Sequence, residues 1–242
     1  MVAKEAVVET IELGSITAEV IKKDIKNIHL SVYPPAGNVR IAAPLRMDLD
    51  TIRIFAISKL GWIKQQQAKL RNQKRETIRE FVSRESHYFL GKRYLLKVVE
   101  TTGKPAVSIK HDKLILQVKP DSTTEQKQII MQEWYRDQLK LLIPKFISKW
   151  EAIMGVQLNE YGIKKMKTKW GTCNIEAKRI WLNLELAKKP VEYLEYIIVH
   201  EMVHLLERHH NDRFVAYMNK FLPQWVHLKG ELNRLPLGYV EW

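Results

Sequence analysis

The sequence has few of the features that mark secreted, membrane-spanning or repetitive proteins. Its single cysteine, Cys173, excludes an internal disulfide bond and favours a reducing compartment. No run of about 18 apolar residues is present, so we expect no transmembrane helix and no membrane partner. A basic N-terminal segment followed by an apolar one is also missing, so no signal peptide is predicted. These absences predict a soluble, cytoplasmic protein.

Acidic residues are scarce relative to basic ones. The chain has 40 Lys and Arg against 27 Asp and Glu, a formal net charge of +13 at pH 7. The excess is concentrated in residues 53–93 and 164–179. Such a charge attracts polyanions or acidic protein substrates, so DNA or another polyanion is a candidate partner. A solvated, lysine-rich surface explains the same excess without a dedicated partner.

Apolar residues make up 45% of the 242-residue chain, enough for one large domain or two small ones. Residues 1–122 are predicted to form a β-rich region, with strands between residues 6 and 43 and between 87 and 118. Helical periodicity after Asp48 predicts a basic helix over about residues 48–75. A second short helix is expected over about residues 76–85.

The second region, residues 123–242, combines helices with a hairpin. Helical periodicity and turn residues predict its elements: a long helix from Thr123 or Thr124 to about Met154, hairpin arms at Lys165–Cys173 and Arg179–Leu184, a helix starting at Pro190, and a helix from Arg213 to about Leu222. The fold class is therefore α+β, with a β-rich N-terminal half.

One short string carries chemistry: His200-Glu201-Met202-Val203-His204 has the form H-E-x-x-H. Residues four apart lie on the same face of a helix, so His200 and His204 can offer two imidazoles to one metal ion. Glu201 lies one step round the helix, within reach of a water on that metal. Such a string arises by chance about once per hundred chains of this size. The apolar helical context, the following histidines and the preceding hairpin favour a zinc site.

The third ligand must come from beyond this helix. Because each helical residue advances about 100°, an unbroken helix carries the later histidines away from the metal, so the helix must end between Leu206 and Arg208. His210 is favoured because its offset of ten matches an extended zinc-protease pattern, although that pattern has Gly where this chain has Glu207. His209 is the close alternative, and Glu207 and Glu231 are weaker ones.

Three protein ligands leave a fourth position for water. Zinc lowers the pKa of that water and polarises a bound carbonyl, and Glu201 would transfer the proton to the leaving amine. An oxyanion partner other than zinc is not assigned, and the candidates are His209, Tyr217 and His227.

The hairpin is expected to form one wall of the substrate cleft. Trp181 and Asn183 are predicted to border that cleft. An edge strand there can pair with an extended peptide through main-chain hydrogen bonds. Cys173 is expected to be a small buried thiol, with a fourth ligand or a redox control as alternative roles.

The chain resembles a known family, the YgjP-like metallopeptidases, which are akin to the SprT-like and WLM metalloproteases. The resemblance covers about residues 20–236 and is strongest over 165–225. Its motifs are Trp170–Asn174, Ile180–Asn183, Tyr196–Leu205, His210 and Phe214.

The resemblance implies a zincin-like, zinc-dependent peptidase with His200, His204 and His210 as ligands and Glu201 as catalytic acid/base. The chain departs from the family in having His209-His210-Asn211 where Asn-His-Ser or Asn-His-Gly is usual. It also has Thr172 where Ser is usual. SprT-like relatives act on DNA-bound proteins, and by analogy this would suit the basic charge.

The sequence thus predicts an intracellular zinc metallopeptidase, a hydrolase acting on protein or peptide. One alternative is a nucleic-acid-associated module with a structural zinc, which would bind DNA or RNA with steep salt dependence and cleave nothing. The open fourth position argues against it, because structural zinc sites are normally closed by four protein ligands. Another alternative is a zinc amidohydrolase acting on a non-peptide amide.

We predict that the purified protein holds near-stoichiometric zinc. His200→Ala and His204→Ala should each lose most of it, because each substitution removes one expected ligand. His29→Ala should keep the metal, since His29 is expected on the exposed face of a strand. Elemental analysis of dialysed protein measures all four samples. Wild-type protein with little zinc would contradict the site assignment.

Overall fold

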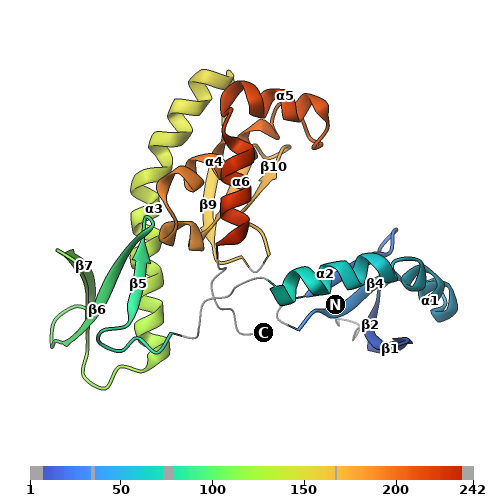
Figure 1. Cartoon of the computed structure of the whole chain (residues 1–242), viewed down its shortest axis with the longest axis horizontal. Coiled ribbons are helices and arrows are strands. Elements are labelled where there is room, and N and C mark those ends of the chain that lie inside the picture. Colours follow the sequence, from blue (N-terminus) through green and yellow to red (C-terminus); the bar gives the residue numbers. More distant parts are fainter. Residues whose placement is uncertain (1–7, 34–35, 73–78, 167, 236–242) are drawn as a thin grey trace. The chain divides into compact units, whose positions relative to one another are not determined.

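The computed structural model describes residues 8–33, 36–72, 79–166 and 168–235. The chain divides into two compact units, residues 1–74 and residues 75–242, and both combine strands and helices (Figure 1). The α+β class expected from the sequence is confirmed. No described helix is both long and apolar enough to cross a membrane.

The first unit is a four-stranded sheet with two helices on one face. Its strands are β1 (Val8–Leu13), β2 (Ile16–Lys23), β3 (His29–Tyr33) and β4 (Asn38–Pro44), in the order β1-β2-β4-β3, with β2 and β4 parallel. Alternate residues point inward, as in Ala18 and Val20 of β2. They form one core with buried residues of α1 (Leu49–Ser58) and α2 (Leu60–Asn72).

The single helix expected over residues 48–75 is two helices within the described residues. Asp48 caps α1 as predicted, and its Oδ1 accepts from the Thr51 N–H at 2.7 Å. The prediction of continuity was wrong at Lys59, whose N–H donates to the Ala56 carbonyl three residues back. That tighter bond ends α1, and α2 begins at the next residue. Residues 73–75 lie outside the described residues.

The second unit begins with another four-stranded sheet, of order β5-β6-β8-β7. Its strands are β5 (Ser86–Phe89), β6 (Lys92–Glu100), β7 (Ala106–Lys110) and β8 (Lys113–Val118). Leu96, Leu114 and Leu116 of this sheet share one core with Met131 and Leu139 of the long helix α3 (Thr124–Met154). This shared core explains why the division lies at residues 74/75 and not at 122/123, where the sequence suggested it.

A three-stranded sheet and three helices complete the second unit. The strands β9 (Glu160–Lys164), β10 (Gly171–Asn174) and β11 (Arg179–Asn183) have the order β10-β11-β9. β10 and β11 form the predicted hairpin, but its first arm is shorter than expected, and β9 adds a parallel partner to β11. A 3₁₀ turn (Leu184–Lys188) leads into α4 (Val191–Val203) and α5 (Asp212–Phe221). The last helix, α6 (Trp225–Arg234), was not predicted.

The turn between β5 and β6 supports the start of α4. The N–H groups of Leu90 and Gly91 donate to the carbonyls of Ala187 and Lys188 at 2.9 and 3.2 Å. Gly91 has φ +79°, and a Cβ there would lie 2.6 Å from Cγ of Pro190. Only glycine fits this position without displacing Pro190, the residue before the first turn of α4.

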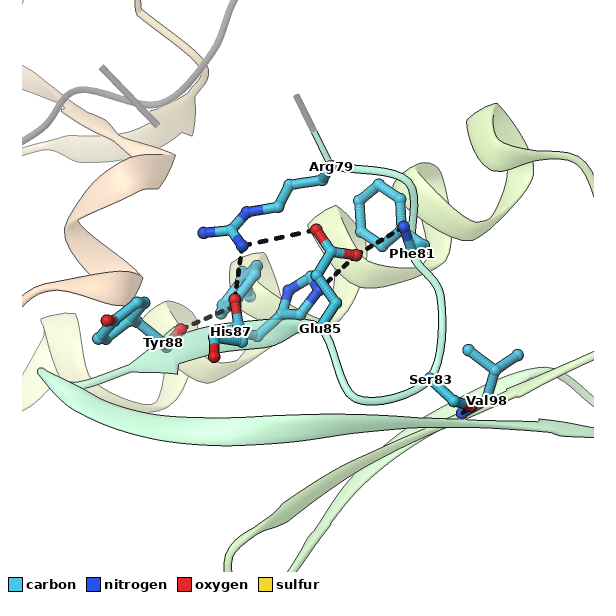
Figure 2. Close-up of polar contacts among 9 residues, drawn as sticks. Arg79, Phe81, Ser83, Glu85, His87, Tyr88 and Val98 are labelled. Atoms are coloured by element: carbon cyan, nitrogen blue, oxygen red, sulfur yellow. Dashed lines mark hydrogen bonds and ion pairs between the residues drawn. The ribbon is translucent and has the colours of Figure 1, made fainter. Parts of the chain in front are cut away.

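The segment before β5 is an irregular loop held by a buried polar cluster (Figure 2). The Glu85 carboxylate accepts from the Phe81 N–H at 2.7 Å and from the Arg79 guanidinium at 3.5 Å. His87 Nε2 lies 3.5 Å from the same carboxylate. The helix expected over residues 76–85 was wrong for residues 79–85, because Phe81 and Arg84 have φ of 55° and 73°. Residues 76–78 lie outside the described residues.

Because His87 is buried, we predict that the protein loses stability at acid pH. Burial lowers the pKa of its imidazole from 6.5 to about 4. The unfolded chain therefore takes up this proton at a higher pH than the folded chain, and the free energy of unfolding decreases as the pH falls through that window. Between about pH 7.5 and 4.5, wild type should lose about 2–3 kcal/mol more than His87→Phe in urea unfolding.

His227→Gln provides the control for this comparison, because His227 is exposed on α6 of the same unit. It should show the wild-type loss of stability with falling pH. If the free energy of unfolding depends on pH equally in wild type and His87→Phe, the buried imidazole does not cause the loss of stability at acid pH.

Candidate metal centre

The helix α4 brings the H-E-x-x-H string into the core of the second unit. Its residues Ile198, Val199 and Met202 are fully buried. The helix ends at Val203, before the Leu206–Arg208 interval expected from the sequence. The N–H groups of residues 205–207 donate to the carbonyls of Met202 and Val203, so the chain turns immediately after the helix.

The returning segment places His210 beside the two helical histidines. One possible ligand atom from each of His200, His204 and His210 lies within 4.8 Å of the others. The Nε2 atoms of His200 and His210 are 3.1 Å apart. Asn211 then caps α5, because its Oδ1 accepts from the Phe214 N–H at 3.0 Å.

The alternative ligands lie elsewhere among the described residues. His209 is exposed and is not a member of the three-histidine group. The Glu207 carboxylate accepts from the His209 N–H at 3.2 Å. Glu231 pairs with Arg234 on α6 at 2.8 Å. The geometry therefore favours His210 as the third member of the set.

The three histidines suit a zinc ion. Two ligand atoms at zinc–nitrogen distance in a tetrahedral site stand about 3.3–3.4 Å apart, close to the observed 3.1 Å. Burial lowers the pKa of the His200 imidazole to about 3, and it also lowers the pKa of His204 and His210. All three are thus held in the neutral form that binds metals. His204 Nδ1 lies 3.2 Å from the Glu207 carbonyl, a contact that orients the ring.

Phe214 forms the apolar support of the three imidazoles. Its ring centroid lies 5.0, 4.9 and 4.6 Å from those of His200, His204 and His210. The side chain is 1% exposed, so it fixes the rings from the protein interior. Reasoning from spacing missed this role, although Phe214 was part of the family resemblance. The signal was an apolar residue in the first turn of the helix that follows His210.

Glu201 lies against the backbone of β10. Its side chain is buried, and burial raises the pKa of the carboxyl to about 8, while the charge of Lys169 opposes that rise. A Cβ on Gly171 would lie 2.7 Å from Oε1 and 2.8 Å from Cγ of Glu201, and 2.9 Å from Ile197 Cγ2. The carboxylate therefore occupies space that any other residue at position 171 would fill.

An open cleft of about 1220 Å³ contains the three histidines and Glu201. One wall is formed by residues 169–176, including β10, and another by residues of α6, among them Trp225 and Lys229. In the sheet order, β10 has β11 on one side and no strand on the other among the described residues. The cleft therefore has a strand edge along one wall.

Trp181 and Asn183, predicted to border the cleft, are not among its lining residues. The indole of Trp181 lies directly over Gly162 of β9, which the parallel pairing of β9 and β11 brings beneath it. Asn183 is fully buried, and its Nδ2 donates to the carbonyls of Met166 and Lys169 at 3.0 and 2.8 Å. Asn183 thus holds the loop before β10 from inside the protein.

The oxyanion candidates His209, Tyr217 and His227 also lie outside the cleft lining. Cys173 does line it, half-buried on β10. Burial, assisted by the charge of Glu201, raises the pKa of its thiol to about 11. The thiol is therefore held in its protonated form.

A histidine triad and an adjacent buried glutamate, both in an open cleft, are the arrangement of a metal-dependent hydrolase. A family model described as YgjP-like, metallopeptidase domain, matches residues 26–235. The chain belongs to this family, which confirms the resemblance seen in the sequence, and it is a metallopeptidase. No curated protein matches the chain.

Two solved structures of metallopeptidase zymogens match part of the chain. Abylysin of Pyrococcus abyssi is 19% identical over 37% of this chain and 90% of its own, with a TM-score of 0.35. Jannalysin of Methanocaldococcus jannaschii is 18% identical over 37% of this chain and 92% of its own, with a TM-score of 0.33.

The contact between Gly171 and Glu201 predicts a specific kinetic defect. Gly171→Ala should displace the carboxylate and lower kcat by about 10–100-fold, because a small misplacement of a catalytic group is costly. Zinc content and KM should change little, since the three atoms nearest to the added Cβ belong to Glu201 and Ile197 and not to the histidines. Steady-state kinetics and metal analysis measure the effect.

Gly230→Ala is the matched control, because a Cβ at this α6 position meets no atom within 4 Å. It should retain wild-type kcat. A Gly171→Ala enzyme with wild-type kcat would contradict the positioning role. A variant that loses zinc would instead indicate a general collapse of the site.

Proposed function

We propose that the protein is a zinc-dependent endopeptidase of cytoplasmic proteins, with His200, His204 and His210 as metal ligands and Glu201 as acid/base. The observation that carries the proposal is the placement of three neutral imidazoles beside a buried glutamate on the floor of an open cleft. Three nitrogen ligands leave one position for water or substrate, which is the ligand set of catalytic zinc sites.

A zinc ion held by His200, His204 and His210 would supply Lewis acidity, which would lower the pKa of a coordinated water and polarise a carbonyl. Residues of the chain transfer the proton and hold the reacting groups in position. The Glu201 carboxylate accepts a proton from the attacking water and returns it to the leaving amine nitrogen. Gly171 keeps the carboxylate in place by leaving it room, and Phe214 holds the imidazole planes.

The shape of the cleft supports a peptide substrate. Its volume of about 1220 Å³ exceeds the roughly 300–1000 Å³ typical of small-molecule sites. The edge of β10 presents main-chain groups that an extended peptide can pair with, strand to strand. Such pairing would bring a scissile bond along β10 to Gly171 and hence to Glu201.

The two alternative functions, a nucleic-acid-associated module with a structural zinc and a zinc amidohydrolase, receive less support. A structural zinc site is closed by a fourth protein ligand, whereas the group here has three members and lies in an open cleft. A small non-peptide amide would leave most of the cleft unfilled. A polyanion partner stays a prediction from the net charge, and the peptidase proposal does not depend on it.

Glu201→Gln tests the chemistry. The amide cannot accept the proton, so hydrolysis of a casein or peptide substrate should fall by about 10²–10⁴-fold while the zinc content stays at the wild-type level. Glu192→Gln makes the same change in the exposed first turn of α4 and should keep wild-type activity. Peptide cleavage that survives in Glu201→Gln would overturn the mechanism.

A further inference from the structure

Two lysines stand close to the candidate metal centre on different elements. Lys169 lies in the loop before β10, and Lys229 lies on α6, and both line the cleft. Both side chains belong to exposed residues. Within the described part of the chain, neither ammonium group forms an ion pair with a carboxylate. The cleft thus offers two cations that form no ion pair with a carboxylate of the described residues.

Lys229 is held in place by its neighbours. Its Nζ lies 5.5 Å from the ring centroid of Trp225, one helical turn earlier on α6. The Trp225 indole N–H donates to Oδ1 of Asn219 on α5 at 2.8 Å, which fixes the ring. Lys229 lines the same cleft as His200, His204 and His210.

Lys169 is fixed through its backbone. Its carbonyl accepts from Nδ2 of the buried Asn183 at 2.8 Å, and the next carbonyl, of Trp170, accepts from the Asn183 N–H at 2.9 Å. Lys169 lies two residues before Gly171, the β10 residue whose Cβ would contact Glu201. The lysine therefore stands near the acid/base residue, on the β10 side of the cleft.

Three acidic residues also line the cleft: Glu176, Glu201 and Glu207. Glu201 is buried, and the Glu207 carboxylate accepts from the His209 N–H at 3.2 Å. Among the exposed charged residues of the lining, one is acidic, Glu176 in the turn after β10, and three are basic: Lys169, Arg208 and Lys229. The exposed charge of the cleft lining is therefore mainly positive.

We propose that Lys169 and Lys229 form two carboxylate-binding subsites flanking the metal centre, so that the cleft selects peptide segments with Asp or Glu near the scissile bond. The proposal rests on the peptidase function proposed above. A lysine ammonium pairs with a carboxylate as a point charge, which suits side chains that approach from an extended substrate.

The test uses a mixed peptide library with acetylated and amidated ends, digested by the full-length zinc enzyme. Mass spectrometry identifies the cleaved bonds. Wild type should enrich Asp and Glu over Asn and Gln near those bonds by up to about fivefold per position, the range expected for a solvent-exposed ion pair. The enrichment should weaken as salt is raised, because the charges are screened.

Variants of the two lysines assign the subsites. Lys229→Met should abolish the acidic preference on one side of the cleaved bond, and Lys169→Met should abolish it on the other. Lys229→Glu should reverse the preference on its side toward Lys and Arg. Lys220→Met is the matched control, because Lys220 contacts the Phe221 ring at 5.4 Å on α5 but does not line the cleft. It should keep the wild-type pattern.

Three outcomes would overturn the proposal. The first is equal cleavage next to acidic and amide residues, and the second is an acidic preference that both lysine variants retain. The third is cleavage that requires a free C-terminal carboxylate, tested with the same library without amidation, because the bound carboxylate would then not be a side chain. If wild type and Glu201→Gln leave the same products, the peptidase function itself fails, and that result is distinct from a loss of selectivity.

Discussion

The end of α4 at Val203 is the constraint on which the candidate site depends. His200 and His204 share a helical face, but a helix continued to residue 210 would turn the third imidazole away from them. The chain instead bends at once. The N–H groups of residues 205–207 donate to the carbonyls of Met202 and Val203 at the end of the helix. Asn211 then starts α5, whose Phe214 packs on all three imidazoles. The end of α4 at Val203 thus determines the positions of both His210 and Phe214.

The Glu201 half of the candidate site depends on how closely β10 approaches α4. A buried carboxyl group is unfavourable in an apolar core, and the pKa of Glu201 rises accordingly. The side chain fits there because residue 171 is a glycine, whose missing Cβ leaves room for the carboxyl group. A core that holds an ionisable group against its preference is typical of a functional site, because stability alone would favour an apolar residue there.

Local spacing was enough to predict the helix that carries His200 and Glu201 and the approach of the His200 and His204 side chains. The role of Glu201 stays a prediction. The cleft walls required information that local spacing lacks. Alternation along β11 put Trp181 and Asn183 on the face opposite its leucines. Trp181, however, lies over Gly162 of the parallel neighbour β9, and Asn183 is buried and donates to the loop before β10. α6 was missed because Gln224 makes no side-chain cap and Gly230 interrupts the pattern, although Leu228 and Leu232 are spaced for a buried face. Lys229 was therefore not considered.

The division of the chain at residues 74/75 also follows from packing between segments that are distant in sequence. α3 is about 46 Å long at 1.5 Å per residue, enough to contact both the β7–β8 edge of one sheet and the α4 region of the candidate site. Tyr135 of α3 donates its hydroxyl to the Tyr88 carbonyl at 2.8 Å, and Gly91 of the same sheet abuts Pro190 at the start of α4. Removing residues 79–122 would take away the acceptor of the Tyr135 hydroxyl and the turn that abuts Pro190. The β5–β8 sheet therefore supports the candidate metal centre through α3 and the start of α4.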